Sequence, residues 1–429
     1  MQAIVFYFFS KKYYIIFLFL ISILFLTENY FIIEKISDLV TSIFTGFLKL
    51  LSIPLVFLSI VVTIGKIDSF IATKKMLKNL VIYTFLTTII ASTMALFVFL
   101  IIRPSRGFLF LNHESIINNK LSYFEHIKNI VPTNFIQPFY ENNVLGAFFL
   151  ALLIGIGMLA LPIKNKNSLN TIFSSLFKLI LWLTQEIVKF IPLAMIAFLC
   201  LLIKDLGSNL STKGIGLYLL SLLISNLSQA FIILPIFLLS KGISPFTVFK
   251  KMFPAILIAF FSKSSSVAMP TAIDCAIGKL KISKDIALFS FPLCTTINMN
   301  ACAAFILITV LFVGESSGFS FNFFDLIMWV FIASIAAVGN AGVPMGCYFL
   351  TCSLLSTMNF PLSMMGLILP FYTLLDMVES AINLWSDSCV TAMVDKDIKK
   401  RNELGSLQSL RGKMKSLRKF SKGYNPIKT

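Results

Sequence analysis

Apolar blocks of about 20 residues recur along this chain, and that is the length a helix needs to cross the hydrocarbon core of a bilayer. Two of these blocks, residues 14–31 and 81–102, are nearly free of charge. Of the 429 residues, 57% are hydrophobic and 13% are charged, so water cannot be the solvent for most of the folded surface. The blocks lack the period-two alternation of a membrane β-barrel. The sequence therefore predicts an all-α integral membrane protein within a lipid bilayer.

The positive charge of the chain lies outside the apolar blocks. The formal net charge is +17, and the lysine and arginine residues are confined to connectors and to the basic tail 395–429. Cytoplasmic connectors of membrane proteins are enriched in these residues, so the tail is predicted to be cytoplasmic and to lie on the membrane surface. No basic domain large enough to fold separately exists, so we expect no nucleic-acid partner.

The seven cysteines and two histidines form no metal or disulfide pattern. The cysteines are scattered through apolar sequence without CxxC spacing, which is typical of small packing residues rather than of a disulfide framework. Both histidines, His113 and His126, lie in the polar stretch 103–142. The sequence thus indicates no histidine-based metal or proton site in the membrane, and no cofactor is expected.

The Lys-rich connectors give a consistent path through the membrane when all of them are placed on the cytoplasmic side. The path predicts six N-terminal spans, near residues 13–33, 40–65, 79–102, 142–162, 171–203 and 215–240. The stretch 103–142 then becomes an external segment. The first block is long and lacks a small-residue cleavage site, so it is interpreted as a retained span rather than a signal peptide. We expect a multi-pass protein of the plasma membrane, in bacteria the inner membrane.

The regular pattern fails at two places in the C-terminal part. The apolar stretch 252–277 is interrupted by the serine run Phe261–Ser266 and by Pro270, and lysines flank it on both sides. It must therefore enter and leave on the cytoplasmic side, as a re-entrant hairpin whose tip is the serine run. The stretch 323–361 repeats this design from the other side, with a tip at Gly339–Pro344.

Spans near 285–313 and 362–394 follow the first and second hairpin, which makes 245–394 the predicted transport core. Irregular backbone at membrane depth is tolerated only where protein or a water-filled cavity satisfies its polar groups, so both tips are expected to meet at a cavity. Paired broken helices of this kind mark the solute site of secondary transporters. The half-helix after each tip aims its positive end at the site, which suits a carboxylate. The alternative is that both tips are loops between ordinary short helices.

The last predicted span has one polar face. At about 100° per residue, four polar side chains fall in one narrow stripe, with Glu379 at its edge. The stripe consists of Asp376, Ser380, Asn383 and Asp387. An acid within a span is costly unless it faces the protein interior and finds a partner, so each acid here is a candidate functional residue. The alternative is a buried ion pair, for which Lys263 at the first tip is the deepest cation.

The preceding span contains the polar segment Thr295–Asn300. An Asn-x-Asn run in mid-membrane interrupts helical hydrogen bonding and exposes carbonyl oxygens beside the side-chain oxygens. Hard cations such as sodium prefer oxygen ligands with a carboxylate to offset the charge. Asn298, Asn383 and Asp387 are therefore predicted to form a cation site.

Together these motifs resemble the dicarboxylate/amino acid:cation symporter family, which includes glutamate and neutral amino acid transporters. The resemblance covers most of the chain and is strongest in the C-terminal half. It rests on the serine-rich tip Lys263–Ser266, the segment Thr296–Asn300, the tip Gly339–Pro344 and the polar stripe between Asp376 and Asp387. The resemblance implies eight spans and two re-entrant hairpins arranged as inverted repeats, in a homotrimer whose subunits each move a transport domain like an elevator.

By the same resemblance, residues 1–240 are mostly scaffold and trimerisation surface. The spans near 79–102 and 215–240 are the exception, because they would move with the core 245–394. The second hairpin would be the external gate. The implied cargo is a small organic solute, and the implied coupling cation is sodium or a proton.

The resemblance also assigns roles to single positions. Asp376 matches the acid that holds the amino group of the solute. The other positions matched to solute contacts are Ser265, Ser266, Cys302, Val343, Glu379, Ser380 and Asn383. Cation ligands are matched by Asn298, Asn383 and Asp387 in one sodium site, by Thr296 with carbonyls of the second tip in another, and by Thr87, Thr88 and Asn300 in a third.

The chain departs from the family pattern at several of these positions. Members that carry acidic solutes have an arginine where this chain has Glu379, and the usual aspartate is Asn300 here. The usual Gly-Thr is Ala301–Cys302, and Met345 and Cys347 replace glycines after the second tip. A bidentate cation that would clamp a carboxylate has become an anion, so glutamate or aspartate should be repelled.

Asp376 and Glu379 lie one helical turn apart at low dielectric, where two like charges cannot both stay ionised cheaply. One of them is expected to be protonated in part of the cycle or neutralised by a cationic solute. A neutral or cationic amino acid is thus favoured, driven by a sodium or proton gradient. Two alternatives stay open: a dicarboxylate or acidic amino acid symporter with a rearranged site, and an uncoupled channel or receptor. An enzyme is disfavoured because Asp376 and Asp387 lie roughly 16 Å apart along one helix.

Overall fold

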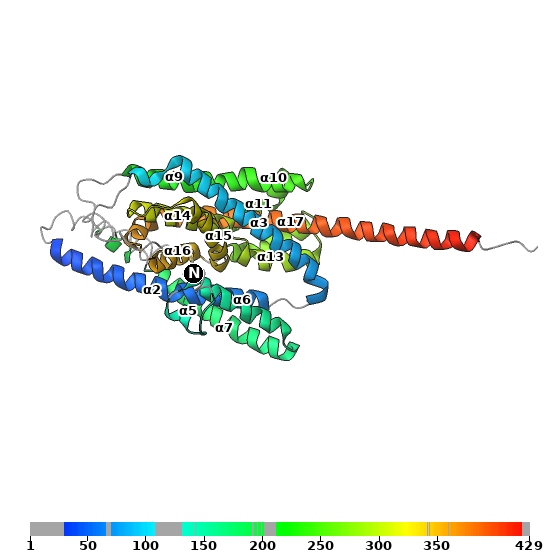
Figure 1. Ribbon diagram of the computed structural model, residues 1–429, viewed down its shortest axis with the longest axis horizontal. Helices are drawn as coiled ribbons and strands as arrows, with labels where there is room; N and C mark the ends of the chain where they lie inside the picture. The colour runs from blue at the N-terminus through cyan, green and yellow to red at the C-terminus, as the bar shows by residue number, and fades with distance from the viewer. Residues whose placement is uncertain are drawn as a thin grey trace, which may run out of the picture.

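A computed structural model of the chain describes residues 30–65, 70–107, 131–141, 143–190, 212–340, 342, 344–358 and 360–422, with 193–200 apart from 195 and 199. Within these ranges the chain is helical and contains no strand (Figure 1). The predicted span 13–33 and most of the external segment 103–142 lie outside the described residues. The all-α prediction is confirmed for the part of the chain that the structure describes.

The N-terminal helices are α2 (Tyr30–Gly65), α3 (Phe70–Ile102), η1 (Pro104–Gly107), α5 (Gln137–Tyr140), α6 (Val144–Ala160), α7 (Ile163–Val188), α9 (Thr212–Ser228), the π-helical turn η2 (Gln229–Ile233) and α10 (Leu234–Ser240). The C-terminal helices are α11 (Pro245–Ser262), α12 (Ser265–Gly278), α13 (Lys284–Ile297), α14 (Asn300–Ser316), α15 (Phe323–Ala337), η3 (Val338–Asn340), α16 (Gly346–Thr357) and α17 (Ser363–Lys422). Seven described segments are long and apolar enough to cross a membrane: Glu34–Gly65, Met76–Arg106, Gly214–Ser240, Pro245–Ser262, Lys284–Ser316, Phe323–Asn340 and Ser363–Lys400.

The helices are arranged around the C-terminal elements (Figure 1). On one side, α2 packs against α6 and α7. On the other side, α3 packs against α9 and α14. Between them, α11 packs against α12 and α17, and α13 packs against α17. The C-terminal elements therefore lie between two layers of N-terminal helices.

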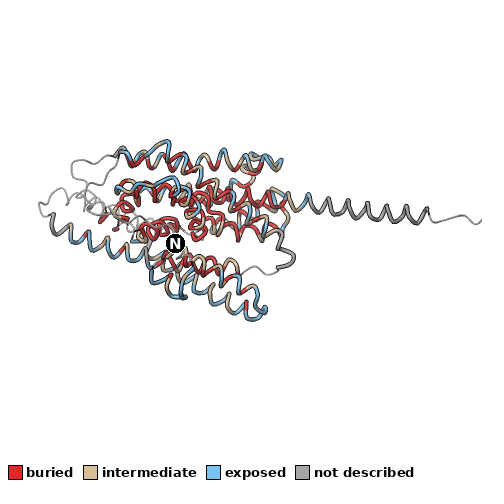
Figure 2. The backbone as a smooth tube through the Cα atoms, viewed as in Figure 1, coloured by how far each residue is buried: buried red, intermediate tan, exposed pale blue. Residues whose placement is uncertain are grey.

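The centre of this bundle is α14. Every residue from Asn300 to Ser316 is buried except Glu315, as expected for a helix that is apolar on all sides. Figure 2 shows the buried backbone in the middle of the bundle and the exposed backbone on the outer helices. Tyr218 of α9 fixes the outer layer to this core, because its hydroxyl lies 2.8 Å from Thr309 Oγ1 and its ring stacks on Phe312 at 4.7 Å between centroids.

The α13–α14 segment is one span with a break in the middle. Asn298 (φ −101°, ψ 66°) and Met299 (φ −104°, ψ 61°) leave the helical region, and α14 restarts at Asn300. The predicted interruption at the Asn-x-Asn run is confirmed.

Two helical hairpins follow the predicted order. α11 and α12 pack against each other and are joined by Lys263, which is left-handed at φ 55°, and Ser264, whose side chain accepts a hydrogen bond from Val267 N and caps α12. The second hairpin turns from α15 through η3 into α16, and Met345 before α16 is also left-handed, at φ 64°.

The first hairpin begins earlier than predicted. α11 starts at Pro245 rather than near 252, because Ser244 caps it by accepting from Thr247 N, and proline suits a first helical position. Lys250 and Lys251 lie inside this helix. They were wrongly interpreted as part of the connector, since charge alone does not end a helix.

Four other helices extend beyond their predicted apolar blocks. α2 begins at Tyr30 instead of 40, α3 at Phe70 instead of 79 and α7 at Ile163 instead of 171. α17 continues as one helix to Lys422 instead of ending near 394. Hydropathy detects only the apolar part of a helix, whereas lysine, arginine, leucine and glutamate in the polar continuation are good helix formers. Figure 1 shows α17 projecting far beyond the bundle.

The polar end of the buried part of α17 holds two loops of the core together. Lys396 Nζ donates to Gly242 O at 2.7 Å, in the α10–α11 loop. Asp395 accepts a hydrogen bond from Ser283 N at 3.0 Å, in the α12–α13 loop. Both ends of the first hairpin are thus fastened to the helix that carries the polar stripe.

The packing of α2 on α6 gives a stability prediction. A Cβ at Gly155 would lie 2.9 Å from Ile64 Cβ, whereas one at Gly157, two residues on, would meet nothing within 4 Å. Gly155→Ala should force the helices apart and cost about 1–3 kcal/mol. Gly157→Ala should be neutral or stabilise by about 1 kcal/mol, because alanine favours the helix. Thermal unfolding in detergent measures both. Equal melting temperatures for the two variants would contradict the packing.

Candidate solute and cation site

The tips of the two hairpins touch. Ser264 Oγ, at the first tip, donates to Gly342 O, at the second, at 2.7 Å. Gly342 is left-handed (φ 63°), and a Cβ there would lie 2.6 Å from Ser265 Oγ and 2.7 Å from Thr295 O. Only glycine permits both this backbone conformation and this close approach. The two tips therefore meet as predicted, whereas a cavity between them stays a prediction.

The polar stripe of α17 faces this junction from within the bundle. Its four members, Asp376, Ser380, Asn383 and Asp387, are buried, and so is Glu379 at its edge. Asp376 Oδ2 accepts a hydrogen bond from Met345 N at 3.1 Å, so it contacts the second tip. Asn383 Oδ1 accepts from Ala301 N at 2.9 Å, at the first turn of α14. The stripe therefore contacts both broken helices.

Asp387 lies in a cluster of oxygen-bearing side chains at the α13–α14 break. Asn298 Nδ2 donates to Asp387 Oδ1 and to Ser386 Oγ, both at 2.9 Å, and Asn300 Nδ2 donates to Ser386 Oγ at 2.7 Å. From α3, Thr88 Oγ1 donates to Asn300 Oδ1 at 2.8 Å and Thr87 Oγ1 to Asn298 Oδ1 at 3.2 Å. Asn298, Asp387, Thr87, Thr88 and Asn300, predicted as ligands of two separate sites, lie in one connected cluster.

Two other predicted cation ligands form hydrogen bonds outside the Asp387 cluster. The Asn383 amide oxygen, expected beside Asp387, is engaged by the amide of Ala301. Thr296 Oγ1 accepts from Thr63 Oγ1 of α2 at 3.1 Å and donates to Pro292 O. Thr296 therefore lies at the contact with the N-terminal helices. Its predicted role in a separate cation site, with carbonyls of the second tip, stays a prediction.

The remaining predicted solute contacts lie at the tips or next to them. Ser265 is buried at the start of α12, and Ser266 beside it is partly buried. Val343 lies outside the described residues. Cys302 is joined to Cys347 by a disulfide bond, so the interpretation of all seven cysteines as packing residues is wrong for this pair. The fold brings together two positions 45 residues apart, which spacing along the chain does not reveal.

Sequence reasoning missed two residues of the site. Ser386 bridges Asn298 and Asn300. Tyr372 OH donates to Glu379 Oε2 at 3.2 Å. Helical spacing could have found both, because Ser386 follows Asn383 by three residues and Tyr372 precedes Glu379 by seven.

Few groups in the described part of the protein offset the negative charge of the three buried acids of α17. Among the described residues, the recorded ion pairs include none of Asp376, Glu379 and Asp387, and Lys263 acts on Asp376 only at longer range through its charge. Glu379 Oε1 and Asp387 Oδ2 also have no hydrogen-bond partner in the described chain. A buried carboxylate without a partner costs several kcal/mol, so both groups favour a cation or a proton.

Comparison with known proteins agrees with this arrangement. The sequence profile of the sodium:dicarboxylate symporter family matches residues 13–397. The proton/sodium-glutamate symport protein of Bacillus caldotenax is 22% identical over 367 residues, which cover 82% of this chain and 86% of that protein. Neutral amino acid transporter B(0) of Oryctolagus cuniculus is 22% identical over 402 residues, 84% of this chain and 73% of the transporter. Excitatory amino acid transporter 3 of the same species is 26% identical over 262 residues, 61% of this chain and 50% of the transporter.

The profile match spans most of the chain and includes both hairpin tips, the α13–α14 break and the polar stripe. It also agrees with the several apolar helices of the bundle. This protein therefore belongs to the sodium:dicarboxylate symporter family, a family of multi-pass membrane transporters and not of enzymes.

Proposed function

We propose that this protein is a symporter that imports a neutral or cationic amino acid with a sodium ion or a proton. The choice of solute rests on the surroundings of Glu379. This buried acid receives one hydrogen bond, from Tyr372, and one of its oxygens has no partner among the described residues. An acidic solute would bring a further negative charge to a site that already holds Asp376 and Glu379, whereas a cationic solute would neutralise one of these acids.

The proposed architecture has eight spans and two re-entrant hairpins, α11–α12 and α15–α16. Lysines at both ends of the first hairpin, Lys241 and Lys279, support its entry and exit on one side. By the same rule we place the C-terminal tail on the cytoplasmic side, and we propose the plasma membrane as the location of the protein. We infer that residues 245–394 move with α3 and α9–α10 as an elevator within a homotrimer, against a scaffold of the other N-terminal helices.

The second hairpin is the proposed external gate. The acids and amides of the site are buried, so neither solute nor cation reaches them until a tip moves. The Met345 amide donates to Asp376, so the same carboxylate that we expect to hold the amino group of the solute also holds the gate. An ammonium group that replaces this amide would satisfy Asp376 with a stronger, charge-assisted hydrogen bond.

Coupling follows from the position of the Asp387 cluster. Asn298 and Asn300 lie at the break in the span, where both contact the Asp387 cluster. Next to the break, Asn383 accepts a hydrogen bond from the backbone amide of Ala301. A cation at Asp387 would stabilise the local geometry on which the solute contacts depend. Each ligand then raises the affinity of the other, which is the thermodynamic basis of symport.

An acidic solute is the second candidate. The printed names of two relatives, a proton/sodium-glutamate symport protein and an excitatory amino acid transporter, favour it. In that case Glu379 would have to be protonated before the solute binds. The first prediction below separates the two candidates.

Glu379→Gln should flatten the pH dependence of uptake and shift preference from cationic toward neutral amino acids, because the side chain no longer ionises. We expect at least roughly a tenfold loss of affinity for lysine, equivalent to about 1.4 kcal/mol. Uptake of lysine, alanine and glutamate into proteoliposomes across a pH series measures this. Exposed Glu141→Gln is the control. An unchanged pH profile and solute preference would remove Glu379 from the mechanism, and best uptake of glutamate by the unaltered protein would select the acidic candidate.

Asp387→Asn should weaken the dependence of uptake on the cation gradient, because the carboxylate that offsets the cation charge is lost. The half-saturating sodium or proton concentration should rise by roughly tenfold or more, since a charged hydrogen-bonding partner is worth about 1.5–3 kcal/mol. The control is Asp395→Asn, two turns further along α17, where the acid contacts Ser283 and Lys399. If Asp387→Asn keeps the cation requirement of the unaltered protein, the cation site lies elsewhere.

Gly342→Ala should hold the two tips apart, because its Cβ would overlap Ser265 Oγ and Thr295 O. Uptake should fall at least roughly tenfold, since sub-ångström displacement of binding groups has effects of this size. Gly318→Ala provides a matched control, because Gly318 is also left-handed (φ 84°) but a Cβ there meets nothing within 4 Å. Both variants carry backbone strain, so a similar loss of uptake in both would contradict a specific role of the tip contact.

A further inference from the structure

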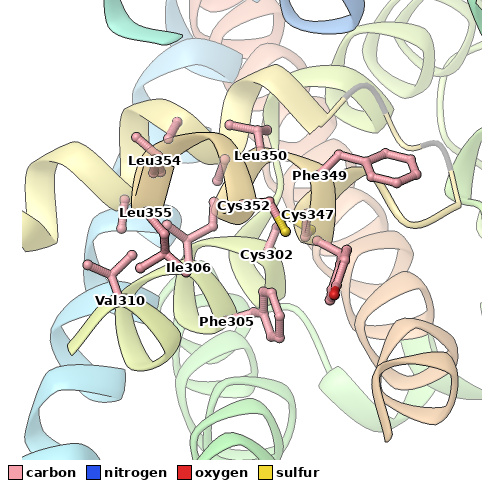
Figure 3. Close-up of a cluster of buried hydrophobic side chains, with 14 of the residues drawn as sticks. Cys302, Phe305, Ile306, Val310, Cys347, Phe349, Leu350, Cys352, Leu354 and Leu355 are labelled. Atoms are coloured by element: carbon pink, nitrogen blue, oxygen red, sulfur yellow. A yellow bond between two sulfur atoms is a disulfide. The ribbon is translucent and has the colours of Figure 1, made fainter. Parts of the chain in front are cut away.

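The disulfide between Cys302 and Cys347 joins the gate hairpin to the central helix. Cys302 lies in the first turn of α14 and Cys347 in the first turn of α16, with 5.7 Å between their Cα atoms. Figure 3 shows the two labelled sulfurs side by side where α16 faces α14. Cys302 follows Asn300 of the cation cluster by two residues, and Cys347 follows Met345, which contacts Asp376, by two residues. The bond therefore lies directly beside both parts of the site.

The bond closes a loop that contains the first helix and the tip of the second hairpin. Residues 303–346, between the two cysteines, include most of α14, all of α15, η3 and the second tip. The non-covalent contacts of α16 with α14 can separate and re-form as a gate moves, but a covalent bond allows no such separation. While the disulfide is intact, the first turn of α16 cannot leave α14.

We propose that Cys302 and Cys347 are a redox modification site that latches the gate: the disulfide holds the second tip closed over the site, and reduction to two thiols releases it. This inference rests on the proposed function in one respect, that the second hairpin is the gate. It extends that function, because transport would then depend on the redox state of one cysteine pair as well as on an ion gradient.

The chemistry of the latch is a two-electron exchange. On closing, the two thiols lose two protons and two electrons to an oxidant such as a small disulfide or a diazene, and one S–S bond forms. On release, a dithiol attacks one sulfur as the thiolate, passes through a mixed disulfide and leaves as its own cyclic disulfide.

Burial determines when this exchange occurs. Cys302 is 0% and Cys347 2% exposed, and both lie in the apolar cluster around Phe305 and Leu350 (Figure 3). Reagents in water reach neither sulfur while α16 packs on α14. Oxidation therefore requires a prior transient opening of the hairpin, and an oxidant traps the closed gate when the hairpin recloses. Reduction requires only that the side chains packed around the bond move aside and admit the dithiol, while the two cysteines stay joined.

The test measures gate opening without requiring a solute. The full chain in proteoliposomes is treated with dithiothreitol or with diamide, a two-electron oxidant, and the 302–347 bond is quantified by alkylation and mass spectrometry. Hydrogen exchange of peptides covering residues 338–347 then reports local opening, and uptake of labelled alanine and lysine reports transport. In the reduced protein we expect exchange at the tip to be roughly tenfold faster or more, and uptake to be higher than in the oxidised protein.

Variants identify the sulfurs responsible. Cys347→Ser should show the fast exchange of the reduced protein under both treatments, and Cys347→Ala should repeat this result if serine is poorly tolerated in the apolar cluster. Cys352→Ser is the matched control, because Cys352 is buried on the same helix and is not disulfide-bonded. This variant should keep the redox difference of the unaltered protein.

Three outcomes would overturn the latch: no 302–347 bond after diamide, equal exchange at the tip in verified oxidised and reduced protein, or a redox difference that persists in Cys347→Ser. Failure of the symporter proposal gives a different result. In that case neither amino acid enters the vesicles in any redox state, while the difference in hydrogen exchange at the tip remains.

Discussion

A polar backbone group that leaves a helix inside an apolar bundle must find its partner within the protein. Three breaks meet in this structure: the α11–α12 tip, the α13–α14 interruption and the second tip before α16. The partners come largely from α17, where Asn383 accepts from Ala301 N and Asp376 accepts from Met345 N. Side chains of one continuous helix thus accept from backbone amides at the starts of α14 and α16.

In the proposed cycle, the hydrogen bonds that stabilise the broken helices also affect gate opening. When the second tip opens, the Met345 amide leaves Asp376, and the buried carboxylate loses its partner. Such a state is costly unless water, a proton or an ammonium group replaces the amide. The free-energy cost of leaving Asp376 without a partner therefore favours gate opening that coincides with exchange of the solute. It disfavours opening when neither solute nor water occupies the site.

Much of the fold was predictable because its cause is local in the sequence. The apolar blocks predicted the helices, the Asn-x-Asn run predicted the break at Asn298, and the spacing of acids predicted a buried stripe that begins at Asp376. The start of α11 was not predictable in this way, because Lys250 and Lys251 lie inside a helix that Ser244 caps. A charge-based topology places a boundary at the lysines, whereas the backbone begins its helix at the cap.

The parts of the site that the sequence did not predict depend on contacts between distant segments. Cys302 and Cys347 are packing residues by composition and become a bonded pair only because α16 folds back onto α14. Asn383 was expected at the cation, but its side-chain oxygen accepts a hydrogen bond from Ala301 N in the first turn of α14. A helical stripe indicates which face is polar, and the neighbouring helix then determines what each group on that face contacts.

The surroundings of Glu379 and Asp387 argue that the two acids receive different kinds of positive charge. Asp387 accepts a hydrogen bond from Asn298 Nδ2, and its cluster also contains the oxygens of Asn298, Asn300 and Ser386. Oxygen ligands beside a carboxylate suit a hard metal cation. Near Glu379 the recorded polar partner is Tyr372, whose ring lies 4.7 Å from that of Phe305 between centroids. Aromatic faces attract organic ammonium groups but supply few oxygen ligands. A desolvated metal ion would lack oxygen ligands near Glu379, whereas a proton or the side chain of a cationic amino acid does not require them. The geometry therefore supports the proposal of solute recognition at Glu379 and ion coupling at Asp387.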